Sequence, residues 1–410
     1  MILYGGKLYD NSFQDELTER LRADIDRALD RDISADTVIN ACDVLSKRVI
    51  DGKYDDVVIP LLNKLGMDRS ELEKTAYIMS GEGLRIKCYR ELDEDMSIGS
   101  RVRKRYPLGA ILHIAAGNAD ILPAYSVIEG LLAGNVNILK LPMGDQGLSV
   151  MLLRELTDIE PALTDYIYVF DVPSADTARI KRLASLCGGI AVWGGDAAVR
   201  AVRTLADPDT RIIEWGHKLS FAYAEPDCDD SELYALAENI CRTDQLLCSS
   251  CQGIFVDTDS KEVQNALAER FFEILKSVSA KYPQDAGIRA KNTINVYTAE
   301  LEHKNVLSGG GVSVTVCDDS DLTLSGMYRN CWVKRLPLDD IGSLRRYKGY
   351  LQTVGLLADD SRRGYISDRL ARAGAVRILR PGAMSDTISG EAHDGTYALR
   401  LYSRIVETEV

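Results

Sequence analysis

The sequence predicts an α/β fold of two domains, each with a largely parallel sheet covered by helices. From Tyr106 onward, short apolar runs alternate with helical stretches, which is the pattern of βαβ units around a buried parallel sheet. The chain has 410 residues, of which 46% are apolar and 27% are charged. This composition is that of a globular protein, and the length exceeds what one ordinary hydrophobic core fills.

About the first ninety residues precede this alternation, and we expect them to be helical. After the start signal Ser12-x-x-Asp15, an apolar residue recurs at every fourth position, which predicts one apolar stripe along a helix. The stripe consists of Phe13, Leu17, Leu21, Ile25 and Leu29. The block contains no pattern typical of chemistry, so we interpret it as packing.

The first α/β segment is predicted to be a doubly wound nucleotide-binding domain of the Rossmann type. Its strand candidates are residues 110–116, 136–139, 166–170, 190–193 and 211–213. Helical patterns such as residues 148–156 and 177–186 lie between them. Ligands of such sheets bind at the carboxyl ends of the strands, where we therefore expect site residues.

A second α/β segment follows, and an acidic turn at residues 225–230 is a plausible seam between the two. A helix is predicted to open at Asp259-x-x-Glu262. The strand candidates are residues 219–224, 293–297, 312–316, 332–336 and 354–357. The alternating stretch 397–406 is predicted to be a closing strand.

Charge and cysteine content exclude several classes of protein. The 49 basic and 62 acidic residues give a net charge of −13, which disfavours nucleic acid and anionic membranes as partners. Nine cysteines scattered along a long chain do not form the disulfide framework of a small secreted domain. No signal peptide or membrane-spanning stretch is visible, so we expect a cytoplasmic protein.

The segment that runs from Thr243 to Gly253 holds two thiols, Cys248 and Cys251, among small polar residues. A reactive thiol in a loop, a zinc site, a thioredoxin-like C-x-x-C and two buried structural cysteines are all compatible with this spacing. Neither G-x-G-x-x-G nor G-x-x-x-x-G-K-[ST] occurs in the chain, so neither common phosphate loop supports the nucleotide site.

Other motifs, in a fixed order, favour the reactive thiol. These are Pro107-x-Gly109 leading to Asn118, the strand that ends in Lys140-Leu-Pro142, and Glu214-Trp-Gly-His-Lys218, which begins 34 residues before Cys248. Together they resemble the aldehyde dehydrogenase superfamily. Further motifs are Asp244-Gln245 ahead of Cys248, Val192-Trp-Gly-Gly195, Leu351-Gln-Thr-Val-Gly355 and His393-Asp-Gly395. These resemble the LuxC-like acyl-CoA reductase branch, which belongs to luminescence-type fatty-acid reductase systems.

The resemblance, which runs from about Tyr106 to the C-terminus, implies an aldehyde-dehydrogenase-like arrangement of domains. Residues 1–217 would hold the N-terminal helices and the nucleotide-binding domain, with an oligomerisation hairpin at about 94–106. Residues 218–390 would form the catalytic domain, and residues 391–410 a closing and oligomerisation strand. The basic run 101–105 would then be a solvated or interface charge run, with contact to coenzyme A or NADP phosphates as the alternative.

The chemistry that the resemblance implies is reduction of an acyl-CoA to an aldehyde. Cys248 would attack the thioester and coenzyme A would leave. The oxyanion would be held by the Asn118 side chain and the Cys248 backbone N–H, and hydride from NAD(P)H would release the aldehyde. Cys251 would be a packed neighbour. Glu214 activates water in aldehyde oxidation, and in a reductase it would tune Cys248 or assist thiol exchange.

For the cofactor, the resemblance implies NADP or NAD, with NADPH favoured. Lys140, followed by Pro142, would hold the adenosine ribose or its 2′-phosphate. The turn Trp193-Gly194-Gly195 would admit a pyrophosphate to a helix N-terminus. One departure is that the superfamily's Glu-x-Phe-Gly-Pro box, whose Glu holds the nicotinamide ribose, has no Glu in residues 327–333 of this chain.

The expected assembly is a homo-oligomer, a dimer or tetramer, with a possible acyl-transfer or synthetase protein as partner. His217 stands where the superfamily has Gly, and we interpret it as structural. Two alternatives stay open, an NAD(P)-dependent aldehyde dehydrogenase working in the oxidative direction and a non-catalytic nucleotide-binding subunit of an acyl-transfer complex.

Overall fold

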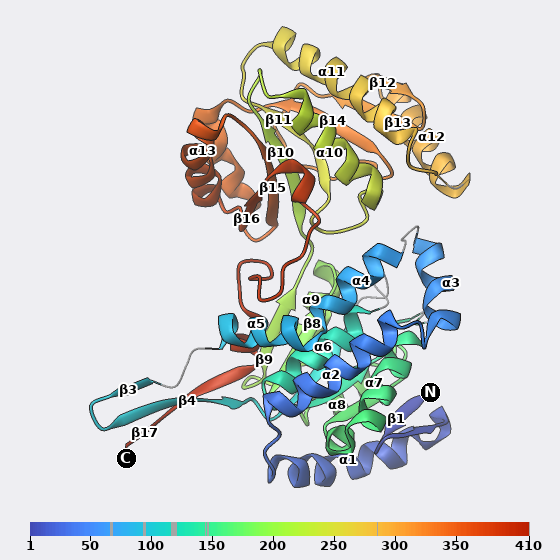
Figure 1. Ribbon diagram of the computed structural model, residues 1–410, viewed down its shortest axis with the longest axis vertical. Helices are drawn as coiled ribbons and strands as arrows, with labels where there is room; N and C mark the ends of the chain where they lie inside the picture. The colour runs from blue at the N-terminus through green and yellow to red at the C-terminus, as the bar shows by residue number, and fades with distance from the viewer. Residues whose placement is uncertain are drawn as a thin grey trace. The chain divides into compact units, whose positions relative to one another are not determined.

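The computed structural model describes residues 1–65, 69–92, 96–115, 121–143, 145, 147–284 and 286–409 (Figure 1). The chain divides into two compact units. Unit 1 comprises Met1–Gly216 and Ile388–Val410, and unit 2 comprises His217–Thr387. None of the helices in the described ranges is both long and apolar enough to span a bilayer.

Unit 1 is built on a seven-stranded sheet in the order β2-β1-β7-β6-β5-β8-β9. Its strands are β1 (Ile2–Tyr4), β2 (Lys7–Tyr9), β5 (Ala110–Ile114), β6 (Val136–Lys140), β7 (Ile167–Phe170), β8 (Gly189–Trp193) and β9 (Arg211–Trp215). From β7 to β9 neighbouring strands are parallel. Strands β6 and β7 follow β5 in sequence and lie on one side of it, whereas β8 and β9 lie on its other side. The strand order therefore reverses between β5 and β8, and their carboxyl ends form a topological switch point.

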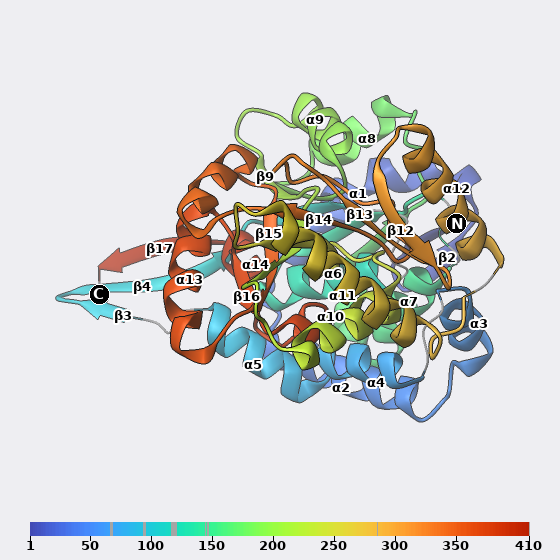
Figure 2. The same cartoon turned by 90° about the horizontal axis from the view of Figure 1, so that it is seen from above.

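Helices cover this sheet. They are α1 (Gln14–Leu29), α2 (Ala35–Ile50), α3 (Asp55–Leu65), α4 (Arg69–Ile78), α5 (Gly81–Glu91), α6 (Leu122–Leu132), α7 (Leu148–Ile159), α8 (Thr177–Ala184), α9 (Asp196–Leu205) and α14 (Ala398–Leu401). Within the N-terminal block, α4 and α5 pack side by side with α2 (Figure 2).

Two sequence predictions for the N-terminal block are wrong in part. The block is not entirely helical, since β1 and β2 precede α1 and extend the sheet beside β7. The predicted stripe is buried at Leu17, Leu21 and Ile25, whereas Phe13 and Leu29 are 45% and 39% exposed. Both exceptions lie at the ends of α1, where a residue no longer faces the sheet.

A separate three-stranded sheet, in the order β17-β4-β3, extends from the rest of unit 1 as an arm (Figure 1). It consists of β3 (Met96–Ile98), β4 (Arg101–Pro107) and β17 (Ser403–Glu409). The basic run lies on β4 opposite acidic residues, with Arg103 paired to Glu407 and Arg101 to Glu409. The predicted strand 397–406 is wrong over 398–401, which form α14 and donate backbone and side-chain hydrogen bonds to Glu91.

Unit 2 contains a second seven-stranded sheet, in the order β12-β13-β14-β11-β10-β15-β16. The strands are β10 (Leu219–Ala224), β11 (Cys251–Val256), β12 (Asn305–Gly309), β13 (Val312–Val316), β14 (Asn330–Arg335), β15 (Leu351–Leu357) and β16 (Arg377–Leu379). The helices α10 (Asp230–Thr243), α11 (Lys261–Ser279), α12 (Ala286–Leu301) and α13 (Asp360–Ala373) pack on it. All neighbouring pairs are parallel except the β12–β13 hairpin.

Three local predictions for this half need correction. Residues 293–297 are not a strand but part of α12, where Thr293 Oγ1 donates to the carbonyl of Arg289 one turn earlier. The preceding helix, α11, is capped by Ser260 rather than by Asp259. The Oγ of Ser260 accepts a hydrogen bond from the N–H of Val263. The acidic turn 225–230 connects β10 to α10 inside unit 2 and is not a seam between units.

Candidate active site

The two cysteines of the predicted site have opposite environments. Residues 244–250, here called the nucleophile loop, join α10 to β11. Cys248 is the exposed one among the nine cysteines, all of which the structure describes. Cys251 is fully buried at the start of β11, its Sγ donates to the carbonyl of Gly253, and burial raises the pKa of its thiol to about 12. An accessible thiol is a possible nucleophile, and a buried thiol with a raised pKa is inert at neutral pH.

Strands β10 and β15 hold Cys248 from two sides. The Nε2 of Gln352 on β15 donates to Cys248 Sγ at 3.4 Å. The carbonyl of Cys248 accepts from Ser220 Oγ on β10 at 2.8 Å, and the same Oγ accepts from the backbone N–H of Thr353 at 3.1 Å. The parallel register of β10 shifts at Ser220 against both of its neighbouring strands. The sulfur and the backbone of Cys248 are therefore both tied to the sheet.

The start of the nucleophile loop has a left-handed backbone. Asp244 and Gln245 have φ angles of 45° and 62°, and Met327, Tyr328 and Arg329 before β14 have φ angles of 53°, 52° and 67°. Non-glycine residues seldom adopt this conformation, and a run of them persists only where surrounding contacts enforce it. The two segments contact each other directly, because the backbone N–H of Tyr328 donates to the carbonyl of Asp244 at 3.0 Å.

Arg329 is the main side-chain link between these segments. Its side chain is 1% exposed and its Nε lies 2.8 Å from Asp244 Oδ1. One terminal nitrogen donates to Ser279 Oγ and to the carbonyl of Tyr282, both at 2.9 Å, and the other donates to the carbonyl of Cys241. The guanidinium thus joins the ends of α10 and α11 to the first residue of the loop.

Gln245 anchors the loop from inside the unit. It is 1% exposed, and its Nε2 donates to the carbonyls of Cys251 at 2.7 Å and Asn330 at 3.1 Å. The Asp244-Gln245 pair of the sequence motif is therefore structural, because its side chains bind to the segment that runs from Arg329 to Asn330. In this chain the region that lacks the expected ribose Glu supports the nucleophile loop.

In unit 1, Lys140 lies at the carboxyl end of β6. Its side chain is largely buried, its Nζ donates to Ser174 Oγ at 2.8 Å, and burial lowers its pKa. Pro142 is buried two residues further on. Lys140 is next to the switch-point strand β5, where a doubly wound sheet binds its ligand.

The predicted pyrophosphate turn lies at the carboxyl end of β8 in the same sheet. Gly195 is the N-cap of α9, no side chain caps this helix, and a Cβ on Gly195 would meet no atom within 4 Å. A helix N-terminus without a side-chain cap fits a phosphate, whereas Asp196 in the first turn disfavours one, and the N–H of Gly194 already donates to the carbonyl of Trp215. Together with Lys140, the turn fits the phosphate end of a dinucleotide.

Trp193 and Trp215 end the neighbouring strands β8 and β9 and stack with ring centroids 5.2 Å apart. His393 lies against both rings at 5.3 and 5.0 Å. The Nε1 of Trp193 donates to Ser126 Oγ, so its indole is fixed and is not a free flap over the turn. The motif His393-Asp-Gly395 thus packs, through His393, on the two tryptophans at the carboxyl ends of β8 and β9.

Glu214 and His217 are the remaining predicted residues whose contacts the structure describes. Glu214 on β9 accepts from Arg203 Nε at 2.6 Å and belongs to unit 1, whereas Cys248 belongs to unit 2. The ring of His217 lies 6.3 Å from that of Tyr350. Asn118 lies outside the described residues. Within the described ranges, no group of three or more His, Cys, Asp or Glu side chains is arranged to share a metal ion.

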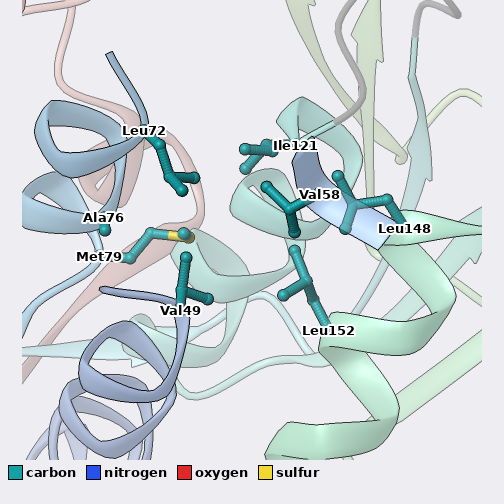
Figure 3. A pocket seen from close by; sticks show the side chains of 8 residues that line it. All are labelled: Val49, Val58, Leu72, Ala76, Met79, Ile121, Leu148 and Leu152. Atoms are coloured by element: carbon teal, nitrogen blue, oxygen red, sulfur yellow. The ribbon is translucent and has the colours of Figure 1, made fainter. Parts of the chain in front are cut away.

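An apolar pocket in unit 1 was not anticipated from the sequence. Aliphatic side chains and one methionine surround it in Figure 3, and they come from α2, α3, α4, α7 and residues that flank the helices. The lining residues are Val49, Val58, Leu72, Ala76, Met79, Ile121, Leu148 and Leu152. The lining offers no hydrogen-bond donor, and the space is too small for a substrate, so we interpret it as a packing gap between helices.

The sequence analysis also missed the supports of the nucleophile loop. Gln352 was part of a recognised motif but had no assigned role, and Arg329 lay in the segment noted only for its missing Glu. Ser220 gave no signal, because a serine in an apolar strand has no distinctive pattern.

A family model described as "Acyl-CoA reductase (LuxC)" matches residues 31–405. Two curated relatives are long-chain acyl-protein thioester reductases. The protein from Aliivibrio fischeri is 24% identical over 329 residues, which are 78% of this chain and 67% of the relative. The protein from Vibrio harveyi is 24% identical over 325 residues, 77% of this chain and 68% of the relative. The chain therefore spans about two thirds of the length of these relatives.

Among solved structures, an NAD-dependent aldehyde dehydrogenase from Sinorhizobium meliloti superposes with a TM-score of 0.77 at 15% identity and covers 100% of this chain and 94% of its own. Glyceraldehyde-3-phosphate dehydrogenase GapN from Methanocaldococcus jannaschii, complexed with NADP, superposes with a TM-score of 0.70 at 16% identity, with coverages of 95% and 94%. These likenesses confirm the predicted aldehyde-dehydrogenase-like α/β fold.

Proposed function

Because the chain belongs to the acyl-CoA reductase (LuxC) family, we propose that it reduces a fatty acyl thioester to an aldehyde with NADPH, through an acyl-enzyme on Cys248. The observation that carries the proposal is the contrast between the two thiols. Cys248 is exposed and its sulfur accepts a hydrogen bond from Gln352, whereas Cys251 is buried.

The reaction has two stages at the same sulfur. The Cys248 thiolate attacks the thioester carbonyl, a C–S bond forms to Cys248, and the bond to coenzyme A breaks with release of its thiolate. A reduced nicotinamide supplies the hydride when bound. The resulting hemithioacetal oxyanion then collapses, so the aldehyde leaves and the Cys248 thiolate is restored.

Each tetrahedral intermediate carries a negative oxygen, and we assign its stabilisation to the Cys248 backbone N–H and the Asn118 side-chain amide. The first donor is held in place because the carbonyl of the same residue accepts from Ser220. Removing one such donor typically costs about 10²–10³ in kcat, so Asn118→Ala is expected to fall in that range with little change in cofactor affinity.

We assign the cofactor to the carboxyl edge of the unit 1 sheet. Lys140 would bind the adenosine ribose or its 2′-phosphate, and the turn Trp193-Gly194-Gly195 would bind the pyrophosphate. The support is the position of Lys140 beside the switch point and the uncapped N-terminus of α9. NADPH is favoured over NADH because a cation at this position pairs with a 2′-phosphate.

Glu214 is assigned to hydrolysis of the acyl-enzyme, which is a side reaction of a reductase, and not to the reduction itself. Its carboxylate accepts a hydrogen bond from Arg203, which fixes its direction. A carboxylate base activates water for hydrolysis of an acyl-enzyme, and reduction does not require that water.

The acyl donor has two candidates. Acyl-CoA follows from the family description, and an acyl-protein thioester follows from the names of the curated relatives. We further propose a cytoplasmic homo-oligomer, a dimer or tetramer joined through the β3-β4-β17 arm, with an acyl-transfer or synthetase protein as a partner.

The test follows NADPH oxidation and aldehyde formation together, with acyl-CoA thioesters of increasing chain length. We expect one aldehyde per NADPH in the native protein, none in Cys248→Ala, and most of the activity in the matched control Cys251→Ala. If the two variants exchange behaviour, the nucleophile is misassigned. Activity only with aldehyde and NADP⁺ would indicate the oxidative enzyme, and NADPH binding without turnover would indicate a non-catalytic subunit.

A further inference from the structure

We propose that Gln352 is a second catalytic residue, whose side-chain amide binds the sulfur of Cys248 and stabilises it as a thiolate. This inference deepens the proposed function and rests on the nucleophilic role of Cys248. It assigns a role to a residue of the Leu351–Gly355 motif that the reaction scheme above does not use.

The first argument is the contact itself. Gln352 is 5% exposed, and its Nε2 lies 3.4 Å from Cys248 Sγ, which is a normal donor-to-sulfur distance. A hydrogen bond donated to the charged form of a group favours that form. Because the thiolate and not the thiol attacks the substrate, a donor placed on the sulfur increases the reactive population.

The second argument is that the geometry is imposed from the sheet. Thr353, the next residue on β15, donates its backbone N–H to Ser220 Oγ at 3.1 Å, and Ser220 Oγ donates to the carbonyl of Cys248 at 2.8 Å. Ser220 and Thr353 are fully buried. Two successive residues of one strand therefore fix the sulfur and the backbone of Cys248, and a site built on a strand is more precise than one built on a loop.

The third argument is the contrast with the neighbouring thiol. Cys251 is the other thiol of the same segment, its Sγ donates to a carbonyl, and burial raises its pKa to about 12. Cys248 differs because it is an exposed residue and a side-chain amide reaches its sulfur. The thiol that a substrate can reach is therefore the one that Gln352 contacts.

The amide would act at both stages of the reaction. It stabilises the thiolate before attack on the thioester, and it stabilises the thiolate again when the hemithioacetal collapses and the aldehyde leaves. In the acyl-enzyme the sulfur is a neutral thioester and a poor acceptor, so the hydrogen bond weakens. This difference favours the two states in which Cys248 carries charge.

The test compares Gln352→Met with the matched control Gln264→Met. Gln264 lies on α11 in the same unit, is fully buried and donates its Nε2 to the carbonyls of Cys317 and Val333, so the control removes similar bonds away from the site. Two rates are measured at one pH, alkylation of Cys248 by iodoacetamide, followed by peptide mass, and acylation by an acyl-CoA without cofactor.

Gln352→Met is expected to slow both rates by about 10- to 100-fold, the range for losing a hydrogen bond to a charged group. Gln264→Met should leave the alkylation rate unchanged. Gln352→Glu keeps the shape but places a carboxylate beside the sulfur, so it should alkylate no faster than Gln352→Met. This variant also keeps the test valid if the Met variant does not fold.

The outcomes separate the two proposals. If both Gln352 variants alkylate as fast as the native protein, the role of Gln352 is overturned even where an acyl adduct forms. If alkylation slows as expected but the native protein forms no acyl adduct, the contact and its effect on the thiol stand and the proposed function fails.

Discussion

Arg329 is expected to be the most costly single side chain to remove from unit 2. Among the described residues, Arg329 has the largest of the fully buried side chains. Its guanidinium donates to Asp244, Ser279, Tyr282 and Cys241. In Arg329→Met these acceptors stay in place, but the donors that satisfy them are lost. The carboxylate of Asp244 then faces an apolar side chain where it had a cation.

The loss of stability depends on how far water can replace the partner that the remaining charged side chain has lost. Breaking a buried ion pair by removing one member costs about 3–5 kcal/mol. The Asp244 side chain is 17% exposed, so water reaches part of it and the cost falls at the lower end, about 3 kcal/mol. A domain is stable by about 5–15 kcal/mol, so this loss is a large fraction of the total. Asp244→Asn keeps an oxygen acceptor but leaves the guanidinium, which is 1% exposed, without its counter-charge, so it should also cost about 3 kcal/mol.

The assay is urea unfolding followed by circular dichroism and tryptophan fluorescence, together with the rate of Cys248 alkylation. The control is Arg372→Met, which removes an exposed i, i+4 ion pair with Asp368 and should barely move the midpoint. The double variant of Arg329 and Asp244 should lose less stability than the sum of the two single variants. If Arg329→Met unfolds at the same urea concentration as Arg372→Met, the buried guanidinium does not hold the nucleophile loop.

Three further predictions concern unit 1. Lys140→Met should weaken NADPH binding about 10- to 100-fold and NADH binding less, as measured by fluorescence titration, and equal losses would remove Lys140 from the 2′-phosphate. Glu214→Gln should lower hydrolysis of a preformed acyl-enzyme by about 10²–10⁴ and spare the hydride step in single turnovers, and the reverse pattern would contradict its assignment. Burial lowers the pKa of His113 to about 4. Between pH 6.5 and pH 4 the unfolded chain therefore binds more protons than the folded chain, so the contribution of His113 to stability is full above pH 6.5 and is lost as the pH falls toward 4. The loss is about 3 kcal/mol, and His113→Gln should remove that slope in unfolding measured from pH 7 to 4.5.

The sheets were predictable because a parallel strand buried on both faces has to be an apolar run. Each of the five strand candidates of the first segment overlaps a strand for this reason, and residues 136–139, 190–193 and 211–213 lie wholly within β6, β8 and β9. The candidate 110–116 runs past the end of β5 at Ile114 and its last residue lies outside the described residues, and the candidate 166–170 begins one residue before β7. Residues 293–297 failed because a short run rich in β-branched residues is also compatible with a helix, and the context of α12 decided the outcome. The strands β1 and β2 are three residues each, too short to show a period.

Site residues could be predicted from the sequence only where they belong to a recognisable motif. Cys248 and Lys140 were identified by residue type and order, and the structure gives each a distinct environment. Arg329 was not predictable as a buried cation, because nothing local in the sequence distinguishes it from a surface arginine. Its partner Asp244 is 85 residues away in sequence, and only the fold brings the two together.

The most direct test of the account is the intact mass of the protein after mixing with a series of acyl-CoA thioesters in the absence of any nicotinamide. We expect a mass increase of one acyl group, removable by hydroxylamine, with the modified peptide containing Cys248. The adduct should be absent in Cys248→Ala and present in Cys251→Ala. An unmodified mass with every thioester, or an adduct that survives in Cys248→Ala, would contradict the claim that Cys248 is the nucleophile of an acyl thioester reductase.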